Sequence, residues 1–410
     1  MKILGPGLLY AGAAVGVSHL VQSTRAGATY GFELAGILLL ANAIKYPFFE
    51  FGPRYAAATG KSLIEGYKNS GRWSLILFAL LTVGTMFTIQ AAVTIVTAAL
   101  IANVFNLQLS PVTVSAVILA ITMLLLISGR YSVIDRVVKF VIVLLALSTI
   151  AAVLFAWSKG YHPDPEHLRN FEWGFRPDWL FLIAFVGWMP APIDVTVWQS
   201  LWTNAKYAES NSSPRMKDVL LDFRIGYIGT ALLALGFLAL GAFVLYGTGE
   251  ELSPKGSVFA GQFINMYTTS IGSWAYPIIA IAAITTMFST TLTCLDAYPR
   301  VMKPLRENLF NSGSSNRTGH AEQVIWLVIT AGGALVVMSW LASTMQTMVD
   351  IATTLSFVTA PVLAFLNLKA VLGKEVPDKY RPGKGLRIYA WIGIVFLAIF
   401  TLVYFYWVFL

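Results

Sequence analysis

The chain has 410 residues, of which 57% are hydrophobic and only 12% are charged, and its mean hydropathy is +0.70. Soluble domains carry roughly 25% charged residues, so this composition excludes an ordinary soluble protein and predicts a polytopic helical membrane protein. A single cysteine, Cys294, excludes an internal disulfide and a thiolate metal cluster. Basic loops between spans explain the net charge of +8, so we expect a lipid bilayer and no nucleic acid as partner.

Apolar runs of about 20 residues, each long enough to cross a hydrocarbon core of roughly 30 Å, recur along the chain. We expect an all-α fold in one transmembrane domain, residues 1–410, with no inserted soluble domain. The N-terminal stretch MKILGPGLL has one lysine and no small-residue cleavage site, so we expect no cleavable signal peptide. Eleven spans are predicted, at roughly 5–30, 32–57, 72–103, 109–128, 132–157, 178–204, 217–247, 273–298, 322–344, 346–371 and 387–409.

Basic residues concentrate in alternate loops, namely 54–72, 130–139, 300–317 and 369–387, whereas 104–108 and 343–346 are uncharged and 248–257 carries the pair Glu250–Glu251. Cytoplasmic loops are enriched in Lys and Arg. We therefore expect a cytoplasmic N-terminus and an outward C-terminus in a multi-pass protein of the prokaryotic inner membrane.

Two predicted spans contain interruptions at mid-membrane. The first holds Gly16, Val17, Ser18 and His19, and the sixth holds the run Met189-Pro190-Ala191-Pro192. If residues 5–157 and 178–371 are two repeats, followed by an extra helix at 387–409, both breaks fall in the first helix of a repeat, and the repeats are inverted. Matched interruptions are the best sequence indication of a transporter's binding site, because unwound backbone survives only where it lines a cavity or is buried in protein. A packing kink is the alternative.

Polar side chains near the breaks are candidate ligands, each with a structural alternative. Asp194 is either an anionic metal ligand or the third residue of a half-helix that begins at Pro192, where the helix dipole favours a carboxylate. Met189 offers a soft thioether for a metal, or fills the core. His19 is a ligand, a proton shuttle, or a neutral donor that holds the unwound backbone. Ser18 and Gln22 supply neutral oxygens.

Other polar residues lie deep in the predicted spans. Lys45 and Glu50 are expected to pair within the second span, and Asp296 is expected to face the bundle interior. Asp350 either faces the interior or caps the start of the tenth span. No Walker-type glycine loop, serine elbow or HExxH sequence occurs, so we expect no enzyme and no cofactor.

At these residues the chain resembles the Nramp family, the divalent-metal transporters of the inverted-repeat, LeuT-like class. The resemblance covers nearly the whole chain, through GPGLLYAG, AGATYGF, ATGKSLIEGY, GRYSVIDRVVKF and the Met189–Pro190 pair. It implies a 5+5 inverted repeat with broken first and sixth helices, plus an eleventh helix.

Several functional positions of the family are replaced. Its Asp-Pro-Gly-Asn at the first break corresponds to Gly16 through His19, and its Met-Pro-His at the second becomes Met189-Pro190-Ala191. A further family histidine corresponds to Thr196, and an acidic pair tied to proton movement corresponds to Phe87 and Gln90. Only Met189 is kept among these groups.

We therefore expect an Nramp-like secondary transporter that moves a small solute by alternating access without strong proton coupling. A divalent metal cation, bound by Met189 and Asp194, is the first candidate. The alternatives are a carrier for a small organic solute and a non-transporting membrane sensor that has kept the fold.

Overall fold

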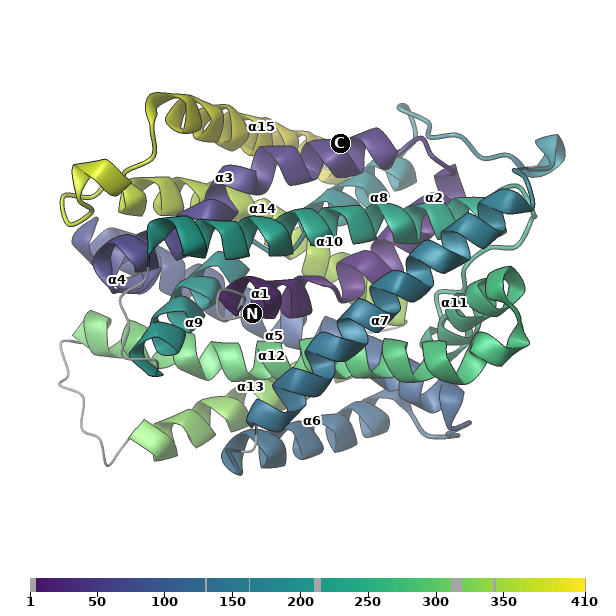
Figure 1. Ribbon diagram of the computed structural model, residues 1–410, viewed down its shortest axis with the longest axis horizontal. Coiled ribbons are helices and arrows are strands. Elements are labelled where there is room, and N and C mark those ends of the chain that lie inside the picture. The colour runs from purple at the N-terminus through teal and green to yellow at the C-terminus, as the bar shows by residue number, and fades with distance from the viewer. Residues whose placement is uncertain are drawn as a thin grey trace.

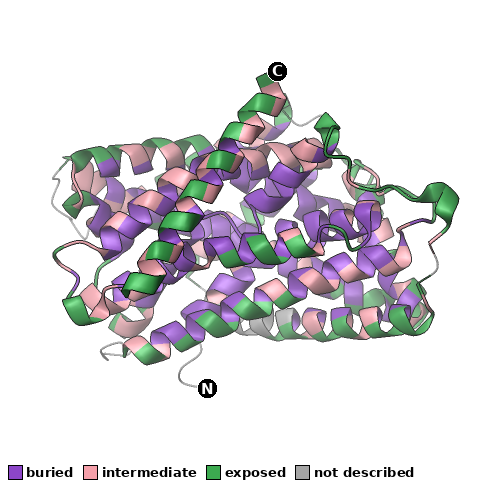
Figure 2. Cartoon of the chain, turned by 90° about the horizontal axis from the view of Figure 1, so that it is seen from above, coloured by how far each residue is buried: buried purple, intermediate pink, exposed green. Residues whose placement is uncertain are grey.

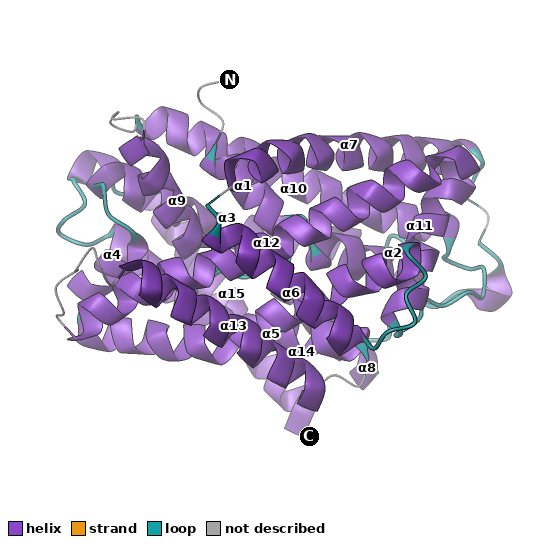
Figure 3. Cartoon of the chain, turned by 90° about the horizontal axis from the view of Figure 1, so that it is seen from below, coloured by secondary structure: helices purple, strands orange, loops and turns teal. Residues whose placement is uncertain are grey.

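The computed structural model describes residues 5–129, 131–161, 163–209, 215–310, 319–341 and 344–409. Most helices run along the longest axis, and the connecting loops gather at the two ends of the bundle (Figures 1 and 3). The first half contains α1 (Pro6–Ala14), the π-helix η1 (Ser18–Ser23), α2 (Thr24–Tyr30), α3 (Ala35–Thr59), α4 (Leu63–Asn69), α5 (Arg72–Val104), α6 (Pro111–Ile127) and α7 (Tyr131–Ser158).

The second half begins with a short 3₁₀ turn and ends in a long helix on the outside of the bundle. Its elements are η2 (Pro165–His167), α8 (Arg176–Gly187), α9 (Val195–Glu209), α10 (Met216–Val244), α11 (Gly256–Ile271), η3 (Ser273–Ala275), α12 (Tyr276–Phe310), α13 (Gly319–Leu341), α14 (Met345–Val371), η4 (Asp378–Tyr380) and α15 (Lys384–Phe409).

The all-helical class is confirmed, and each predicted span range overlaps a helix or a pair of half-helices. Within the described ranges, six helices are long and apolar enough to cross a membrane by length and composition, namely α5, α10, α12, α13, α14 and α15. Eleven crossings and the internal repeat stay predictions. Two helices, α4 and α11, lie outside the predicted spans.

Local sequence signals explain where several helices begin. Ser62 and Glu65 form a capping box at the start of α4. Thr344 caps α14 by accepting a hydrogen bond from the Thr347 amide at 3.1 Å. Asp350 lies further inside this helix, so the expectation that it caps the tenth span is wrong.

Burial distinguishes the inner helices from the outer ones. Buried residues fill the inner helices, and exposed ones lie along the outward faces of the outer helices (Figure 2). Many of the exposed side chains are large and apolar, among them Leu124, Leu147, Trp340, Ile388 and Leu402. An apolar exterior of this kind suits contact with lipid.

The loops sort into two groups. One end of the bundle carries α4 and the turn at 372–383, and the opposite end carries α11 and the segment at 163–175 (Figure 1). We call these the α4 end and the α11 end. Contacts hold the α4 end together: Lys68 Nζ lies 3.1 Å from Asn308 Oδ1, and Arg54 Nη1 donates to the Tyr380 carbonyl at 3.0 Å. The side chains of the predicted basic turn at 130–139 lie outside the described residues, as does Arg317.

Candidate functional site

Two interrupted helices meet inside the bundle. The chain leaves helical geometry at Val15 and Gly16, between α1 and η1, and again over 188–194, between α8 and α9. Ser18 Oγ lies 3.2 Å from the Pro190 carbonyl oxygen, so the two breaks are in contact. The first break is narrower than predicted, because Ser18 and His19 already belong to the π-helix.

A small cavity of about 20 Å³ lies between the two breaks, and we call it the central cavity. A cavity needs roughly 10–15 Å³ of this kind of volume to hold one water molecule, so the space admits a species of about that size. The first break contributes Val17 and Ser18 to its lining, and the second contributes Trp188, Ala191 and Pro192. The two breaks therefore lie in contact around a small cavity.

The lining of the central cavity is uncharged. Its polar side chains are Ser18, Thr290 and Cys294, and alanine, valine, isoleucine, proline and tryptophan form the rest. No group of three or more His, Cys, Asp or Glu side chains that could hold a metal ion occurs in the described part of the chain. Any cation in this cavity would depend on backbone carbonyls, hydroxyls and the Cys294 sulfur.

Thr290 of α12 closes the gap that the first break leaves. Its hydroxyl lies 3.3 Å from the Gly12 carbonyl and 3.5 Å from the Val15 carbonyl, and 3.1 Å from the Thr286 carbonyl of its own helix. Gly16 makes this approach possible, because a Cβ there would lie 2.8 Å from the Thr290 methyl carbon. Gly16 is thus placed beside the cavity by packing.

His19 does not point into the central cavity. Its Nε2 lies 3.0 Å from the Thr230 carbonyl of α10, so this nitrogen carries the proton and donates it. The other nitrogen, Nδ1, then accepts a hydrogen bond from Ser18 Oγ at 2.7 Å. Both ring nitrogens are in hydrogen bonds, and the ring joins the first broken helix to α10.

The two predicted metal ligands both lie outside the cavity lining. Met189 is fully buried, and Asp194 is only 4% exposed. The Asp194 carbonyl accepts from the Val197 amide at 2.9 Å, so this residue immediately precedes α9. It was expected at the third helical position, and that placement is wrong because the helix begins at Val195.

The Asp194 carboxylate is an unusual group in this interior. Its Oδ2 atom is buried and has no hydrogen-bond partner among the described residues. The side chain lies within electrostatic range of Tyr67 and Tyr298. A buried carboxylate oxygen without a partner is costly, and it marks a place where a proton, a water molecule or a cation would bind.

Lys45 and Glu50 do not pair, contrary to expectation. Glu50 instead accepts from Arg54 of the next helical turn, at 2.5 Å, and from the Tyr46 hydroxyl at 2.6 Å. Lys45 is completely buried, and its Nζ donates to the carbonyls of Val186 and Gly187 at 2.6 and 2.8 Å. These carbonyls are the last two of α8, where the second break begins.

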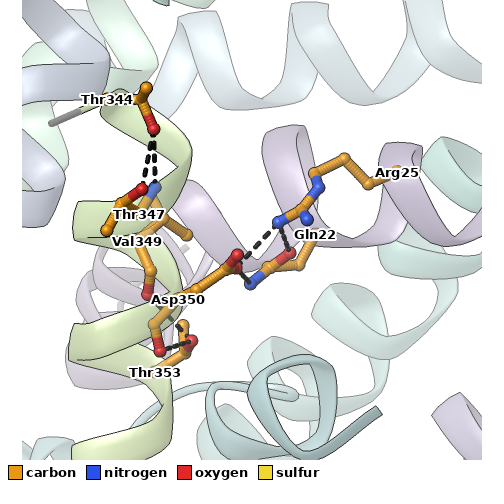
Figure 4. Close-up of polar contacts among 7 residues, drawn as sticks. All are labelled: Gln22, Arg25, Thr344, Thr347, Val349, Asp350 and Thr353. Atoms are coloured by element: carbon orange, nitrogen blue, oxygen red, sulfur yellow. Dashed lines mark hydrogen bonds and ion pairs between the residues drawn. The ribbon is translucent and has the colours of Figure 1, made fainter. Parts of the chain in front are cut away.

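Gln22 does not line the central cavity and belongs instead to a polar group next to it. Its Nε2 donates to Asp350 Oδ1 at 3.1 Å, and its Oε1 accepts from Arg25 Nη1 at 2.8 Å. Arg25 Nη1 also forms an ion pair with Asp350 Oδ1 at 2.8 Å. We call these three residues the Arg25 network, and Figure 4 shows Gln22 and Arg25 pointing toward Asp350 on the neighbouring helix.

A larger polar hollow of about 560 Å³ opens at the α11 end, and we call it the vestibule. Arg25, Tyr30, Arg169, Tyr246 and Glu250 are part of its wall. From Ser18 at the central cavity, Gln22 follows after about one turn of the same broken helix and Arg25 after about another. The Arg25 network therefore lies between the vestibule and the central cavity.

Asp222 of α10 holds the other end of the first broken helix. Its two carboxylate oxygens accept from the Gly5 and Gly7 amides at 3.0 and 2.7 Å. These amides belong to the start of α1, where unsatisfied donors and the helix dipole favour a negative charge. Sequence reasoning missed this clamp, and also the roles of Arg25 and of Lys45, because each depends on a partner more than 100 residues away.

Gln90, Thr196 and Phe87, singled out in the sequence analysis, are neutral side chains in the interior of the bundle. Gln90 Nε2 lies 3.1 Å from Thr94 Oγ1 and 3.3 Å from the Thr291 carbonyl, and its Oε1 is a buried atom without a partner among the described residues. Thr196 Oγ1 donates to the Phe48 carbonyl at 3.1 Å. Phe87 packs against Gly333, where a Cβ would lie 2.2 Å from its ring.

Two broken helices that enclose a buried cavity are the architecture of LeuT-like membrane transporters. The family model described as natural resistance-associated macrophage protein-like matches residues 7–407, nearly the whole chain. The chain therefore belongs to the Nramp family, which is a family of membrane transporters and not of enzymes.

Individual proteins are similar to this chain in sequence or in fold. An uncharacterized protein of Pasteurella multocida is 37% identical over 406 residues, which cover 98% of this chain and 91% of that protein. A crystal structure of a mutant Eremococcus coleocola manganese transporter matches with a TM-score of 0.67 at 12% identity, covering 97% of this chain and 85% of that one. MhsT in complex with L-phenylalanine matches with a TM-score of 0.60 at 16% identity, covering 97% and 98%.

Proposed function

We propose that the chain is a secondary transporter that moves a small solute through the central cavity by alternating access. The observation that carries this proposal is the contact between the two breaks, Ser18 Oγ to the Pro190 carbonyl at 3.2 Å, beside a buried cavity. Polar groups secure the first broken helix on either side of that cavity, through the Arg25 network and through Asp222. Opening one group while the other stays closed would expose the cavity to one side at a time.

We propose eleven membrane crossings arranged as an inverted 5+5 repeat with an eleventh helix. The α4 end carries basic residues such as Lys61, Lys68 and Lys379, and the α11 end carries the acidic pair Glu250–Glu251. The positive-inside rule then assigns the α4 end to the cytoplasm. This orientation gives a cytoplasmic N-terminus and an outward C-terminus in a prokaryotic inner membrane.

A divalent metal cation is the first candidate substrate. Membership of the Nramp family and the likeness to a manganese transporter support it. Among the described carboxylates, Asp194 beside the second break has a buried oxygen without a hydrogen-bond partner, and Met189 supplies a thioether nearby in sequence. Neither side chain lines the cavity in this conformation, so binding a metal there requires Asp194 to turn toward it.

A small organic solute is the second candidate, and the uncharged lining of the cavity favours it. The walls present Trp188, Trp198 and short aliphatic side chains, with hydroxyl and thiol groups at Ser18, Thr290 and Cys294. Apolar walls with a few polar groups are typical of small-molecule sites. The fold accommodates such a ligand in MhsT, whose structure contains L-phenylalanine.

We further propose that a proton gradient does not drive transport. A proton relay needs groups that exchange protons near working pH. Phe87, Gln90, Ala191 and Thr196 occupy the corresponding positions, and none of these side chains titrates. His19, the one histidine beside the breaks, has both ring nitrogens engaged.

Calorimetry on the purified protein with Mg²⁺, Mn²⁺, Co²⁺ and Ca²⁺ tests the substrate. Saturable binding of one of these ions that is lost in Asp194→Asn supports the metal candidate, provided that the variant keeps its melting temperature. Absence of binding for all four rejects it. In that case a thermal-shift screen of small neutral and zwitterionic solutes tests the second candidate, and Ser18→Ala and Thr290→Val should weaken any hit. Substrate-dependent acidification of proteoliposomes would contradict the uncoupled mechanism.

A further inference from the structure

Lys45 is a buried basic side chain beside the last backbone carbonyls of α8. The last carbonyls of a helix have no intrahelical partner, and α8 ends at Gly187 because the second break follows it. Lys45 Nζ lies 2.6 Å from the Val186 carbonyl oxygen and 2.8 Å from that of Gly187. The side chain is completely buried in the middle of α3.

No carboxylate lies within ion-pair distance of Lys45 among the described residues, since Glu50 is held by Arg54 and Tyr46. The partial negative charge at the C-terminal end of α8 is therefore what stabilises the ammonium group, together with the two carbonyl oxygens. The Val186 carbonyl also accepts from the Met189 amide at 3.2 Å, but a carbonyl oxygen has two lone pairs, so the two carbonyls at this end of the helix have the chemistry of a small cation site. In transporters with broken helices, unwound carbonyls and half-helix C-termini coordinate the coupling sodium ion or proton.

The surroundings leave little freedom at this end of α8. A Cβ on Gly187 would lie 2.2 Å from the Thr353 carbonyl of α14, so the backbones of α8 and α14 are in direct contact. Lys45 approaches from α3, on which α8 and α14 both pack. The ammonium group thus occupies a prepared pocket and is covalently tethered there.

The geometry points to Lys45 as a built-in substitute for a monovalent coupling cation at the end of α8. This inference rests on the proposed transport function. In it, the positive charge that a mobile sodium ion would supply belongs to the chain itself and is not transported. The chain therefore holds the second break in its working geometry without a bound monovalent cation, and solute movement needs no sodium gradient.

Melting temperatures of the purified protein test the inference without any knowledge of the solute. Lys45→Ala removes the ammonium group and leaves space beside the Val186 and Gly187 carbonyls. We expect its melting temperature to fall in N-methylglucamine chloride and to recover by roughly 2–5 °C as sodium, lithium or ethylammonium chloride is added at constant ionic strength, with saturation. Wild type should show no saturable response to these cations.

Lys159→Ala is the matched control. Lys159 Nζ also donates to a carbonyl near a helix end, that of Thr269 in α11 at 2.6 Å, but the side chain is exposed. Water can solvate that carbonyl after the substitution, so no cation-dependent recovery is expected. Lys45→Arg should keep most of the wild-type stability, and Lys45→Met, which fills the space without donating, should lose it without recovery.

Three results would overturn the inference. They are a Lys45→Ala variant whose melting temperature does not respond to any of the cations, a Lys45→Met variant as stable as wild type, and a wild type that itself needs sodium for stability. The last measurement needs no variant, so the inference stays testable if the substitutions prevent folding. None of these results depends on which solute is carried, so they are distinct from a failure of the proposed function.

Discussion

Arg25 and Asp350 join α2 to α14 through an ion pair of 2.8 Å that lies between the vestibule and the central cavity. Gln22 bridges the two side chains, so the pair is part of a three-residue network (Figure 4). The Arg25 side chain is 12% exposed and that of Asp350 is 33% exposed, so water reaches the pair from one side. A contact of this kind is strong enough to hold a closed state and weak enough to open.

Asp350→Asn should open the path from the vestibule to the central cavity. Cys294 lines the cavity and is the single cysteine in the sequence, so its reaction with a small thiol reagent reports access. Loss of an interaction worth about 1 kcal/mol changes an open population about fivefold. We expect a rise of that order in the labelling rate. Asp218→Asn, which removes an exposed pair with Arg215, is the matched control, and an unchanged rate in Asp350→Asn would rule out a closing role.

Asp222→Ala should loosen the start of α1. The Gly5 and Gly7 amides lose their charge-assisted hydrogen bonds, each worth on the order of 1.5–3 kcal/mol. Hydrogen exchange measured by mass spectrometry should therefore speed up at least tenfold over α1 and stay unchanged in α15. Equal exchange over α1 in the variant and in wild type would show that packing alone fixes this helix.

The positions of the two helix breaks could be predicted from the sequence, but the contacts of the side chains around them could not. Small residues around Gly16 and the prolines at 190 and 192 have a local effect on backbone geometry, so both breaks were predictable. The direction of each side chain was not, because His19 binds the Thr230 carbonyl of α10 and Asp194 is buried outside the cavity lining. The pairing of Lys45 with α8 joins residues 141 positions apart, and a sequence pattern contains no signal for such a contact.

Two short helices were missed for a different reason. The helices α4 and α11 have 7 and 16 residues, so neither reaches the length of a span. Their mixed polar and apolar composition is also typical of a loop. The α11 helix nevertheless buries Phe259, Phe263 and Tyr267 on one face. These three residues recur at intervals of four, so the sequence does contain the amphipathic pattern of this helix.

Gly241→Ala should destabilise the protein strongly. A Cβ on Gly241 would lie 2.4 Å from the Thr24 carbonyl oxygen of α2, and backbone atoms cannot give way as a flexible side chain can. Overpacking of this kind costs about 1–3 kcal/mol or more. We expect a clear fall in melting temperature. Gly84→Ala in α5 has nothing within 4 Å of the added carbon and should leave the melting temperature unchanged or slightly higher, so equal effects of the two would contradict the packing argument.

His19→Ala should lower stability while leaving the pH dependence of solute uptake unchanged. The substitution removes the donor to the buried Thr230 carbonyl, at a cost of roughly 1–3 kcal/mol, whereas the Ser18 hydroxyl keeps the Ala14 and Pro190 carbonyls within reach. Uptake by proteoliposomes, measured from pH 5.5 to pH 8, is the check. A flattened pH profile in His19→Ala would show that the histidine exchanges protons during transport.

The first broken helix touches α10 along almost its whole length. Near the α4 end, Asp222 binds the start of α1, and a Cβ on Gly226 would lie 2.3 Å from the Gly7 carbonyl; further along, Thr230 accepts from His19. Beyond the break, Leu238 and Gly241 meet the backbone of α2. The helix α10 therefore spans the break and contacts the half-helices on both sides of it. The two half-helices can tilt independently only if α10 bends, and its glycines at 226, 229, 236 and 241 supply the places to bend.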